Sequence, residues 1–402
     1  MIDLEKNYSI NARRMKKSVI RELLKLTAKP EIISFAGGLP APETFPIDEL
    51  DDICSSVLKE YGARALQYGP TEGIDLLKDQ LIEWAKRDNV SITRENILIT
   101  VASQQGLDLI SKIFIDPSDP IIVGLPTYLG GLSAFNTYGA HLVGVKVDEN
   151  GMNIDKLEIK LKELRKKEEH YKFVYVVPDF QNPTGTTMTI DRRKKLIELS
   201  KEFDFLILED SPYRELRFEG EEPESMLSLD NIGNVMSLHT FSKIFAPGFR
   251  LGWVIAEPAI IDKLVVAKQS ADLCTPPFTQ FIVYEYMKRG LLEKNIKSTI
   301  EVYKKKKNLM IKYLDKYLPK HDEISWTNPE GGLFLWVKLP KKIDTEKMFE
   351  EAIKENVAYI IGSAFDAYSK SRNCIRLNFS YAKEELFEEG LKRLGKVIEK
   401  NL

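Results

Sequence analysis

Short apolar runs alternate with amphipathic segments through the middle of the chain, the pattern of a mostly parallel α/β sheet. The segment Asp191–Phe203, for example, lies between two such runs and repeats its apolar residues at helical spacing. We therefore predict a mostly parallel seven-stranded sheet sandwiched by helices. Its strands are expected at Ile97–Val101, Ile121–Val123, Leu142–Val147, Phe173–Val177, Phe205–Leu208, Val235–Leu238 and Leu251–Ala256.

The C-terminal part of the chain has a different pattern. From about Lys294 it becomes strongly charged and helical, with a block of lysines at residues 304–307. We predict that this block is the solvated face of a long helix, with nucleic-acid contact as the alternative. Beyond the turn at residues 329–332 the pattern predicts a small α+β lobe. Its elements are a strand at Leu333–Leu339, a helix near Thr345–Glu355 and a strand at Ile375–Phe379.

Composition narrows the class of protein. The 402 residues are 43% hydrophobic and carry a net charge of −2, which indicates a globular protein and gives no reason to expect nucleic acid as a partner. No apolar run approaches the ~20 residues that span a membrane, and the N-terminus lacks a signal-peptide pattern. Three widely separated cysteines and four histidines form no ligand-spaced cluster. We expect a cytoplasmic protein without a metal site.

Candidate chemistry begins at Lys243, which follows a predicted strand by a few residues. A lysine amine forms a Schiff base with an aldehyde once its site lowers a pKa that is ordinarily ~10.4. Taken alone, such a lysine is most often a surface residue. Its neighbours, Thr240 and Ser242 before it and Arg250 after it, offer hydroxyls and a guanidinium to a phosphate. This combination points to pyridoxal phosphate.

An acid ends the preceding strand. Asp210 closes the run from Phe205, and a carboxylate there can keep the cofactor's pyridine nitrogen protonated. Glu209 is the rival, because adjacent side chains of a strand point to opposite faces. A helix N-cap is the structural alternative for Asp210.

Other positions complete the predicted cofactor site. Ser103 and Gln104 follow a strand and open a helical pattern, so backbone N–H groups there can bind the phosphate, although Ser103 could equally be a plain helix cap. Asn182, presented by an Asn-Pro-Thr-Gly turn, and Tyr213 are donors for the ring oxygen. Tyr128 could stack on the ring or be a core aromatic.

Arg376 is the candidate for the substrate. It lies among apolar residues on a predicted strand, and a partly buried guanidinium requires an anion such as a carboxylate. A structural salt bridge is the alternative.

Together these positions resemble the fold-type-I, class I/II aminotransferases that use pyridoxal phosphate, most closely the 2-aminoadipate/kynurenine branch of lysine-biosynthesis type. The resemblance spans nearly the whole chain. It is carried by residues 18–26, 34–40, 66–73, 103–105, 181–185, 243–250 and 329–332, and by Arg376.

The resemblance implies the roles given above and adds others. Tyr68 is expected to reach the cofactor phosphate of the neighbouring subunit, which implies a homodimer with shared active sites. Arg376 is expected to grip the substrate α-carboxylate near Asn182, and Tyr128 to join Lys243 and Asp210 as a catalytic residue. Arg21, on an N-terminal lid helix, and the backbone near Gly38 are expected to line the substrate pocket.

The resemblance also implies the domain division. We expect an N-terminal arm over residues 1–30, a small domain from 31–60 and 291–402, and a large cofactor domain over 61–290. Two departures from the family pattern matter. Ser211-Pro212 precede Tyr213, which should leave Tyr213 in reach, and His239 replaces the usual glycine, so a modest change near the phosphate is expected.

The expected function is ping-pong transfer of an amino group from an L-amino acid, 2-aminoadipate-like, aromatic or of broader range, to a 2-oxo acid such as 2-oxoglutarate. In this scheme the Lys243 amine moves the α-proton. A β- or γ-lyase or a decarboxylase on the same fold is the first alternative. A cofactor-sensing regulator is the second, disfavoured because the family-like region begins by about Ser18 and leaves little room for a DNA-binding segment.

Overall fold

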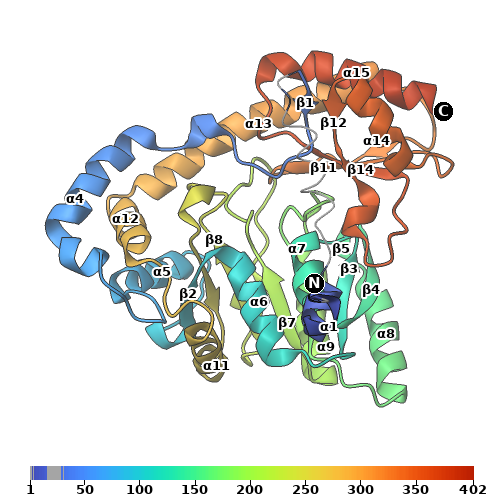
Figure 1. Ribbon diagram of the computed structural model, residues 1–402. Helices are drawn as coiled ribbons and strands as arrows, with labels where there is room; N and C mark the ends of the chain where they lie inside the picture. The colour runs from blue at the N-terminus through green and yellow to red at the C-terminus, as the bar shows by residue number, and fades with distance from the viewer. Residues whose placement is uncertain (1, 3, 16–28, 30) are drawn as a thin grey trace.

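A large sheet forms the centre of the molecule (Figure 1). The computed structural model describes residues 2, 4–15, 29 and 31–402, and all structural statements refer to these residues. The sheet has eight strands in the order β2-β9-β8-β7-β6-β3-β4-β5. Its strands are β2 (Ile97–Thr100), β3 (Pro120–Leu125), β4 (His141–Asp148), β5 (Gly151–Met152), β6 (Phe173–Val176), β7 (Leu206–Asp210), β8 (Val235–Thr240) and β9 (Gly252–Ile255).

All seven strands predicted for this sheet are confirmed, and of its eight described strands only the two-residue β5 was missed. The pairs β3–β4, β3–β6, β6–β7 and β7–β8 are parallel, whereas β9 runs antiparallel to both neighbours. Alternate residues of β6 enter different clusters: Phe173 and Tyr175 pack in one, Val174 and Val176 in the other. Both faces of the sheet are therefore buried at β6, which explains why this strand is continuously apolar.

Helices cover the two faces of the sheet. The predicted helix Asp191–Phe203 is confirmed as α9 (Ile190–Phe203). The other helices of this part are α5 (Asp75–Lys86), α6 (Ala102–Phe114), α7 (Leu129–Thr137), α8 (Ile154–Lys166), α10 (Met226–Leu229), α11 (Pro258–Gln269) and α12 (Pro277–Lys288), preceded along the chain by α1 (Leu4–Asn7), α2 (Ile10–Arg14) and α4 (Ile47–Ala65). Among the described helices, none has the length and apolar composition needed to cross a membrane.

A second lobe lies above the sheet in Figure 1, where α14 and α15 cover its strands. The predicted α+β elements are confirmed as β11 (Phe334–Lys338), α14 (Thr345–Lys354) and β14 (Cys374–Asn378). β11 and β14 are the central pair of an antiparallel four-stranded sheet, and a separate parallel pair joins the N-terminal segment to this lobe. The remaining elements are β1 (Ile33–Ser34), β10 (Ser325–Trp326), β12 (Val357–Ala358), β13 (Ile360–Ile361) and α15 (Phe387–Lys400).

The long helix α13 (Leu291–Tyr317) confirms the predicted helix but corrects the prediction for two of the four lysines at residues 304–307. Lys306 and Lys307 are buried, not solvated. Lys306 donates to Glu43 and to the carbonyl of Ser380, and Lys307 donates to Glu219. Each buried ammonium is thus paired with a carboxylate distant in sequence, which is what makes its burial tolerable.

Candidate active site

The candidate residues gather where the central parallel strands end. β7 ends at Asp210 and β8 at Thr240, and the two strands are parallel neighbours. In such sheets ligands bind beyond the carboxyl ends of the strands. The loop after β6 brings Asn182 to the same edge, and the loop after β8 brings Lys243.

Lys243 points at the chain segment that follows β1. Its Nζ donates to the carbonyl oxygen of Gly38 at 2.7 Å. Burial, together with the positive charges of Arg376 and Arg250, lowers the pKa of Lys243 to about 8. An amine with this pKa is partly neutral near pH 7 and can act as a nucleophile or a base.

Asp210 and Glu209 differ in what their oxygens contact. Glu209 Oε1 accepts from the backbone N–H of Met226, and its Oε2 accepts from Ser237. Asp210 Oδ2 accepts from the hydroxyl of Tyr175 at 2.7 Å, whereas its Oδ1 is buried without a hydrogen-bond partner among the described residues. Burial raises the pKa of Asp210 to about 7. Asp210 ends a strand and caps no helix, so it alone of the two acids has an oxygen left for a ligand.

Asn182 joins two other predicted site residues. Its Nδ2 donates to the hydroxyl of Tyr213 at 3.4 Å, and its Oδ1 accepts from Nη1 of Arg376 at 2.9 Å. The turn that presents Asn182 closes by a hydrogen bond from the Gly185 N–H to the Gln181 carbonyl. Gly185 has a φ of +72°, and a Cβ there would come within 2.5 Å of the Phe334 carbonyl oxygen, so both backbone and space require glycine. Tyr213 thus lies within hydrogen-bonding distance of Asn182, although Pro212 precedes it.

Arg376 lies in an apolar environment. The guanidinium packs over the rings of Phe334 and Phe365, at 4.2 and 4.9 Å from their centroids. Its Nη2 donates to the carbonyl of Ala36 at 2.7 Å, while its buried Nε has no hydrogen-bond partner among the residues that the structure describes. Burial lowers the pKa of Arg376 to about 10. No carboxylate pairs with Arg376 in the part of the chain that the structure describes, so the structural salt bridge considered from the sequence is absent there.

The predicted phosphate-binding groups also come together. Thr240 donates to Ser242 at 2.9 Å, and Nη1 of Arg250 reaches Ser242 at 3.5 Å. Thr240 lies opposite Gly252, where a Cβ would meet Ala102 at 2.9 Å. Because Ala102 begins α6, these hydroxyls lie beside a helix N-terminus, which suits an anion.

The N-terminus of α6 has no side-chain cap, since its N-cap residue is Val101. Ser103 therefore lies inside the first turn and is not the cap. Gln104 Oε1 accepts from the hydroxyl of Tyr128 at 3.4 Å. Tyr128 precedes α7, and its ring lies against Gly130, where a Cβ would come within 2.4 Å of it. This places Tyr128 beside the start of α6.

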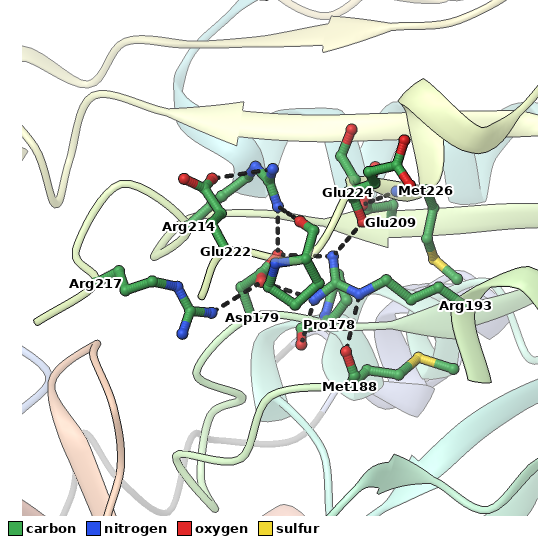
Figure 2. Close-up of polar contacts among 12 residues, drawn as sticks. Pro178, Asp179, Met188, Arg193, Glu209, Arg214, Arg217, Glu222, Glu224 and Met226 are labelled. Carbon is green, nitrogen blue, oxygen red and sulfur yellow. Dashed lines mark hydrogen bonds and ion pairs between the residues drawn. The ribbon is translucent and has the colours of Figure 1, made fainter. Parts of the chain in front are cut away.

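A buried ionic cluster supports two of these loops (Figure 2). Asp179, three residues before Asn182, is 1% exposed and is surrounded by the guanidinium groups of Arg193, Arg214 and Arg217, at 2.7, 3.5 and 4.0 Å. Burial alone would raise the pKa of Asp179, but the charges of Arg193 and Arg214 outweigh it and hold that pKa below its usual range. We call these four residues the Asp179 cluster.

The Asp179 cluster connects distant segments. Arg193 belongs to α9 and also donates to the carbonyls of Met188 and Pro178. Arg214 directly follows Tyr213, and Arg217 reaches Glu330 of the second lobe at 2.9 Å. A single carboxylate thus ties the Asn182 loop to the Tyr213 loop.

The remaining expectations from the sequence concern Tyr68, Arg21 and His239. Tyr68 is 78% exposed, and its hydroxyl makes no hydrogen bond to the site residues that the structure describes. Arg21 lies outside the described residues. The expected effect of His239 on the phosphate region is wrong, because its ring lies on the other face of β8. There it stacks on Trp253 at 4.9 Å and contacts Ser237, and burial lowers its pKa to about 4.

Sequence reasoning missed Tyr175 and Asp179. Tyr175 lies within a continuous apolar strand, so nothing in the pattern separates it from core aromatics. Asp179 carried a weak signal, as a lone acid between a strand and the Asn-Pro-Thr-Gly turn. No group of three or more His, Cys, Asp or Glu side chains within the described ranges is arranged to hold a metal ion.

Comparisons with known proteins show the family to which the chain belongs. The family profile described as aminotransferase class I and II matches residues 49–394. An aromatic-amino-acid aminotransferase of Thermococcus litoralis is 48% identical over 402 residues, covering 100% of this chain and 96% of the relative. The crystal structure of a Pyrococcus horikoshii kynurenine aminotransferase in complex with PMP matches with a TM-score of 0.96 at 46% identity, covering 100% of this chain and 98% of that one. The α-aminoadipate aminotransferase LysN of Thermus thermophilus, complexed with N-(5'-phosphopyridoxyl)-L-leucine, matches with a TM-score of 0.92 at 37% identity, covering 100% and 99%.

Proposed function

Because the chain belongs to the class I and II aminotransferase family and uses pyridoxal phosphate, we propose that it acts on a broad range of L-amino acids. Its donors include 2-aminoadipate-like and aromatic amino acids, and its acceptor is a 2-oxo acid such as 2-oxoglutarate. The observation that carries the substrate assignment is Arg376, a buried guanidinium with an unpaired Nε and no carboxylate among the described residues.

The described residues fit the cofactor. The buried, unpaired Oδ1 of Asp210 is an acceptor awaiting a donor, which a protonated pyridine nitrogen supplies. Asn182 and Tyr213 offer polar groups for the ring oxygen of the cofactor. Tyr128 offers an aromatic face on which the ring can stack. The phosphate would be held by Ser103 and Gln104 at the start of α6, together with Thr240, Ser242 and Arg250. When bound, pyridoxal phosphate supplies an electron sink and carries the amino group.

Lys243 performs the proton transfer in this proposal. Its Nζ would hold the cofactor, and its free amine would take the proton from the substrate Cα. A lysine whose pKa is near 8 can both accept and return that proton around neutral pH. Asp210 stabilises positive charge on the ring throughout.

Arg376 orients the substrate by binding its α-carboxylate. Two N–H groups of a guanidinium match the two oxygens of a carboxylate, and the surrounding Phe334 and Phe365 exclude water and strengthen the pair. Replacing Arg376 by Lys should lower kcat/KM for every amino acid by roughly a hundredfold, because a charged hydrogen-bond pair contributes about 1.5–3 kcal/mol.

Substrate range is tested by comparing kcat/KM for 2-aminoadipate, kynurenine, phenylalanine and leucine, with 2-oxoglutarate as acceptor. The proposal expects all four to react and the aromatic and 2-aminoadipate values to lie within about tenfold, roughly 1.4 kcal/mol. We assign Arg21 to the side-chain carboxylate, so Arg21→Ala should lower the 2-aminoadipate value selectively. Ammonia release without a 2-oxo acid would instead indicate a lyase.

A further inference from the structure

Tyr175 is a buried tyrosine directly behind the cofactor acid. It lies on β6 opposite Leu208 of β7, so its side chain is on the same face of the sheet as Leu208 and Asp210. Its hydroxyl donates to Oδ2 of Asp210 at 2.7 Å. The side chain is 0% exposed, so water does not compete for this hydrogen bond.

Packing fixes where the Tyr175 hydroxyl points. Phe135 of α7 meets the ring edge-on, with the centroids 5.3 Å apart. The ring also lies against Gly131 of α7, where a Cβ would approach two ring atoms to 3.0 Å and the hydroxyl to 3.2 Å. The direction of the O–H group is thus set by close contacts with α7 and not by Asp210 alone.

The consequence is that the two oxygens of Asp210 are not equivalent. Oδ2 accepts a hydrogen bond from Tyr175, whereas Oδ1 is buried and has no partner within the described part of the chain. A hydrogen bond to the ionised form of a carboxylate favours that form over the neutral acid. Burial disfavours the ionised form of Asp210 and raises its pKa, whereas the hydrogen bond from the Tyr175 hydroxyl lowers that pKa.

We propose that Tyr175 is a positioning residue which orients the Asp210 carboxylate and supports its ionised form, so that Oδ1 faces the ring nitrogen of pyridoxal phosphate. The proposal rests on the proposed role of Asp210. Tyr175 acts through Asp210 and does not itself contact the cofactor or the substrate.

The test compares Tyr175→Phe with a matched control, Tyr171→Phe. Tyr171 is also a buried tyrosine close to β6, but its hydroxyl donates to the backbone carbonyl of Phe203 at 3.3 Å, on the other side of the sheet. Each change removes one buried, hydrogen-bonded hydroxyl and leaves the ring in place. Only the first removes a partner of Asp210.

The dissociation constant of pyridoxal phosphate is measured by titrating each apoenzyme, and kcat and KM are measured on the holoenzyme. Tyr175→Phe should raise the dissociation constant and lower kcat, each by about tenfold, because it removes a hydrogen bond to a charged group. KM for the amino donor should change less than about twofold, since Arg376 is untouched. Tyr171→Phe should leave all three values within about twofold.

An unchanged dissociation constant and kcat in Tyr175→Phe would overturn the proposal, and so would equal losses in both variants. Asp210→Asn separates this failure from failure of the proposed function. If Asp210→Asn binds the cofactor normally and stays active, the role of Asp210 is wrong. If it is impaired while Tyr175→Phe is not, only the role of Tyr175 is wrong. In the Asp210→Asn/Tyr175→Phe double variant, the second substitution should change kcat and the cofactor dissociation constant by a smaller factor than it does alone.

Discussion

At the scale of single residues, the site depends on side chains whose ordinary properties are changed by burial. Lys243 has its pKa lowered to about 8, and Asp210 has its pKa raised to about 7. Both shifts follow from desolvation of the charged form, and neighbouring charges add to them. The two groups therefore titrate near neutral pH, where transfer of a proton to and from a substrate is easiest.

The lowered pKa of Lys243 predicts how the apoenzyme takes up its cofactor. Only the neutral amine attacks an aldehyde, so the rate of covalent attachment should rise with pH and level off above about 8. Stopped-flow absorbance after mixing apoenzyme with pyridoxal phosphate measures this rate. Acetyl-lysine, whose amine is unshifted at ~10.4, is the control and should still accelerate beyond that pH. A rate for the protein that keeps climbing alongside acetyl-lysine would show that Lys243 is not desolvated.

Residue type alone could not decide every position. The sequence left Asp210 and Glu209 as rivals, because strand alternation says that they face opposite ways but not which face holds the cofactor. The hydrogen-bond partners distinguish the two acids. Met226 and Ser237 donate to both oxygens of Glu209, and both residues lie far from Glu209 in sequence. Tyr175 could not be distinguished from core residues for the same reason, since its role depends on a contact with another strand.

At the scale of elements, the Asp179 cluster holds together the loops that follow β6 and β7 (Figure 2). The loops carry Asn182 and Tyr213, whose side chains are hydrogen-bonded to each other. Phe180, next to Asp179, has a φ of +47° and packs under the glycines of the 329–332 turn. A residue in that conformation persists only where its surroundings impose it, and the cluster and this turn do so.

Asp179→Asn should therefore destabilise the protein strongly, by about 3–5 kcal/mol, because it leaves buried guanidinium groups without their shared carboxylate. Asp88→Asn is the matched control: Asp88 also pairs with Arg214, at 3.1 Å, but its side chain is 29% exposed. A pair open to solvent contributes about 1 kcal/mol or less. Urea denaturation midpoints at one protein concentration compare the variants. Equal midpoints for the two would mean that Asp179 is not the centre of the cluster.

The sheet elements were predictable from the sequence, and their polar connections were not. Strands buried on both faces, such as β2 and β6, must be continuously apolar and were therefore visible in the sequence. β5 is only two residues long and gives no pattern. The lysines of α13 were assigned to solvent because Glu43 and Glu219, which pair with Lys306 and Lys307, are distant along the chain.

At the scale of the whole molecule, the exposure of Tyr68 bears on the homodimer that is expected from the sequence. Tyr68 is among the candidate phosphate ligands, yet it is 78% exposed and lies at the surface of its own subunit. Nearby Leu66 is 73% exposed, so the segment presents apolar surface as well. We infer a homodimer in which Tyr68 of one subunit reaches the phosphate in the other.

A mixed dimer tests this inference. Tyr68→Ala and Lys243→Ala subunits, each carrying a different affinity tag, are expressed together and the heterodimer is purified. If Tyr68 acts across the interface, one of the two sites contains both native residues, and about half of the wild-type kcat should return. If Tyr68 acts within its own subunit, neither site is complete and the heterodimer should be no more active than the Tyr68→Ala parent.

The most direct test of the account is to locate the lysine that binds pyridoxal phosphate. The holoenzyme is treated with borohydride, which makes the link between amine and cofactor permanent, then digested and mapped by mass spectrometry. We predict one pyridoxyl-phosphate adduct for each subunit, on Lys243. An adduct on a different lysine, or none above the level in Lys243→Ala, would contradict the assignment of the active site.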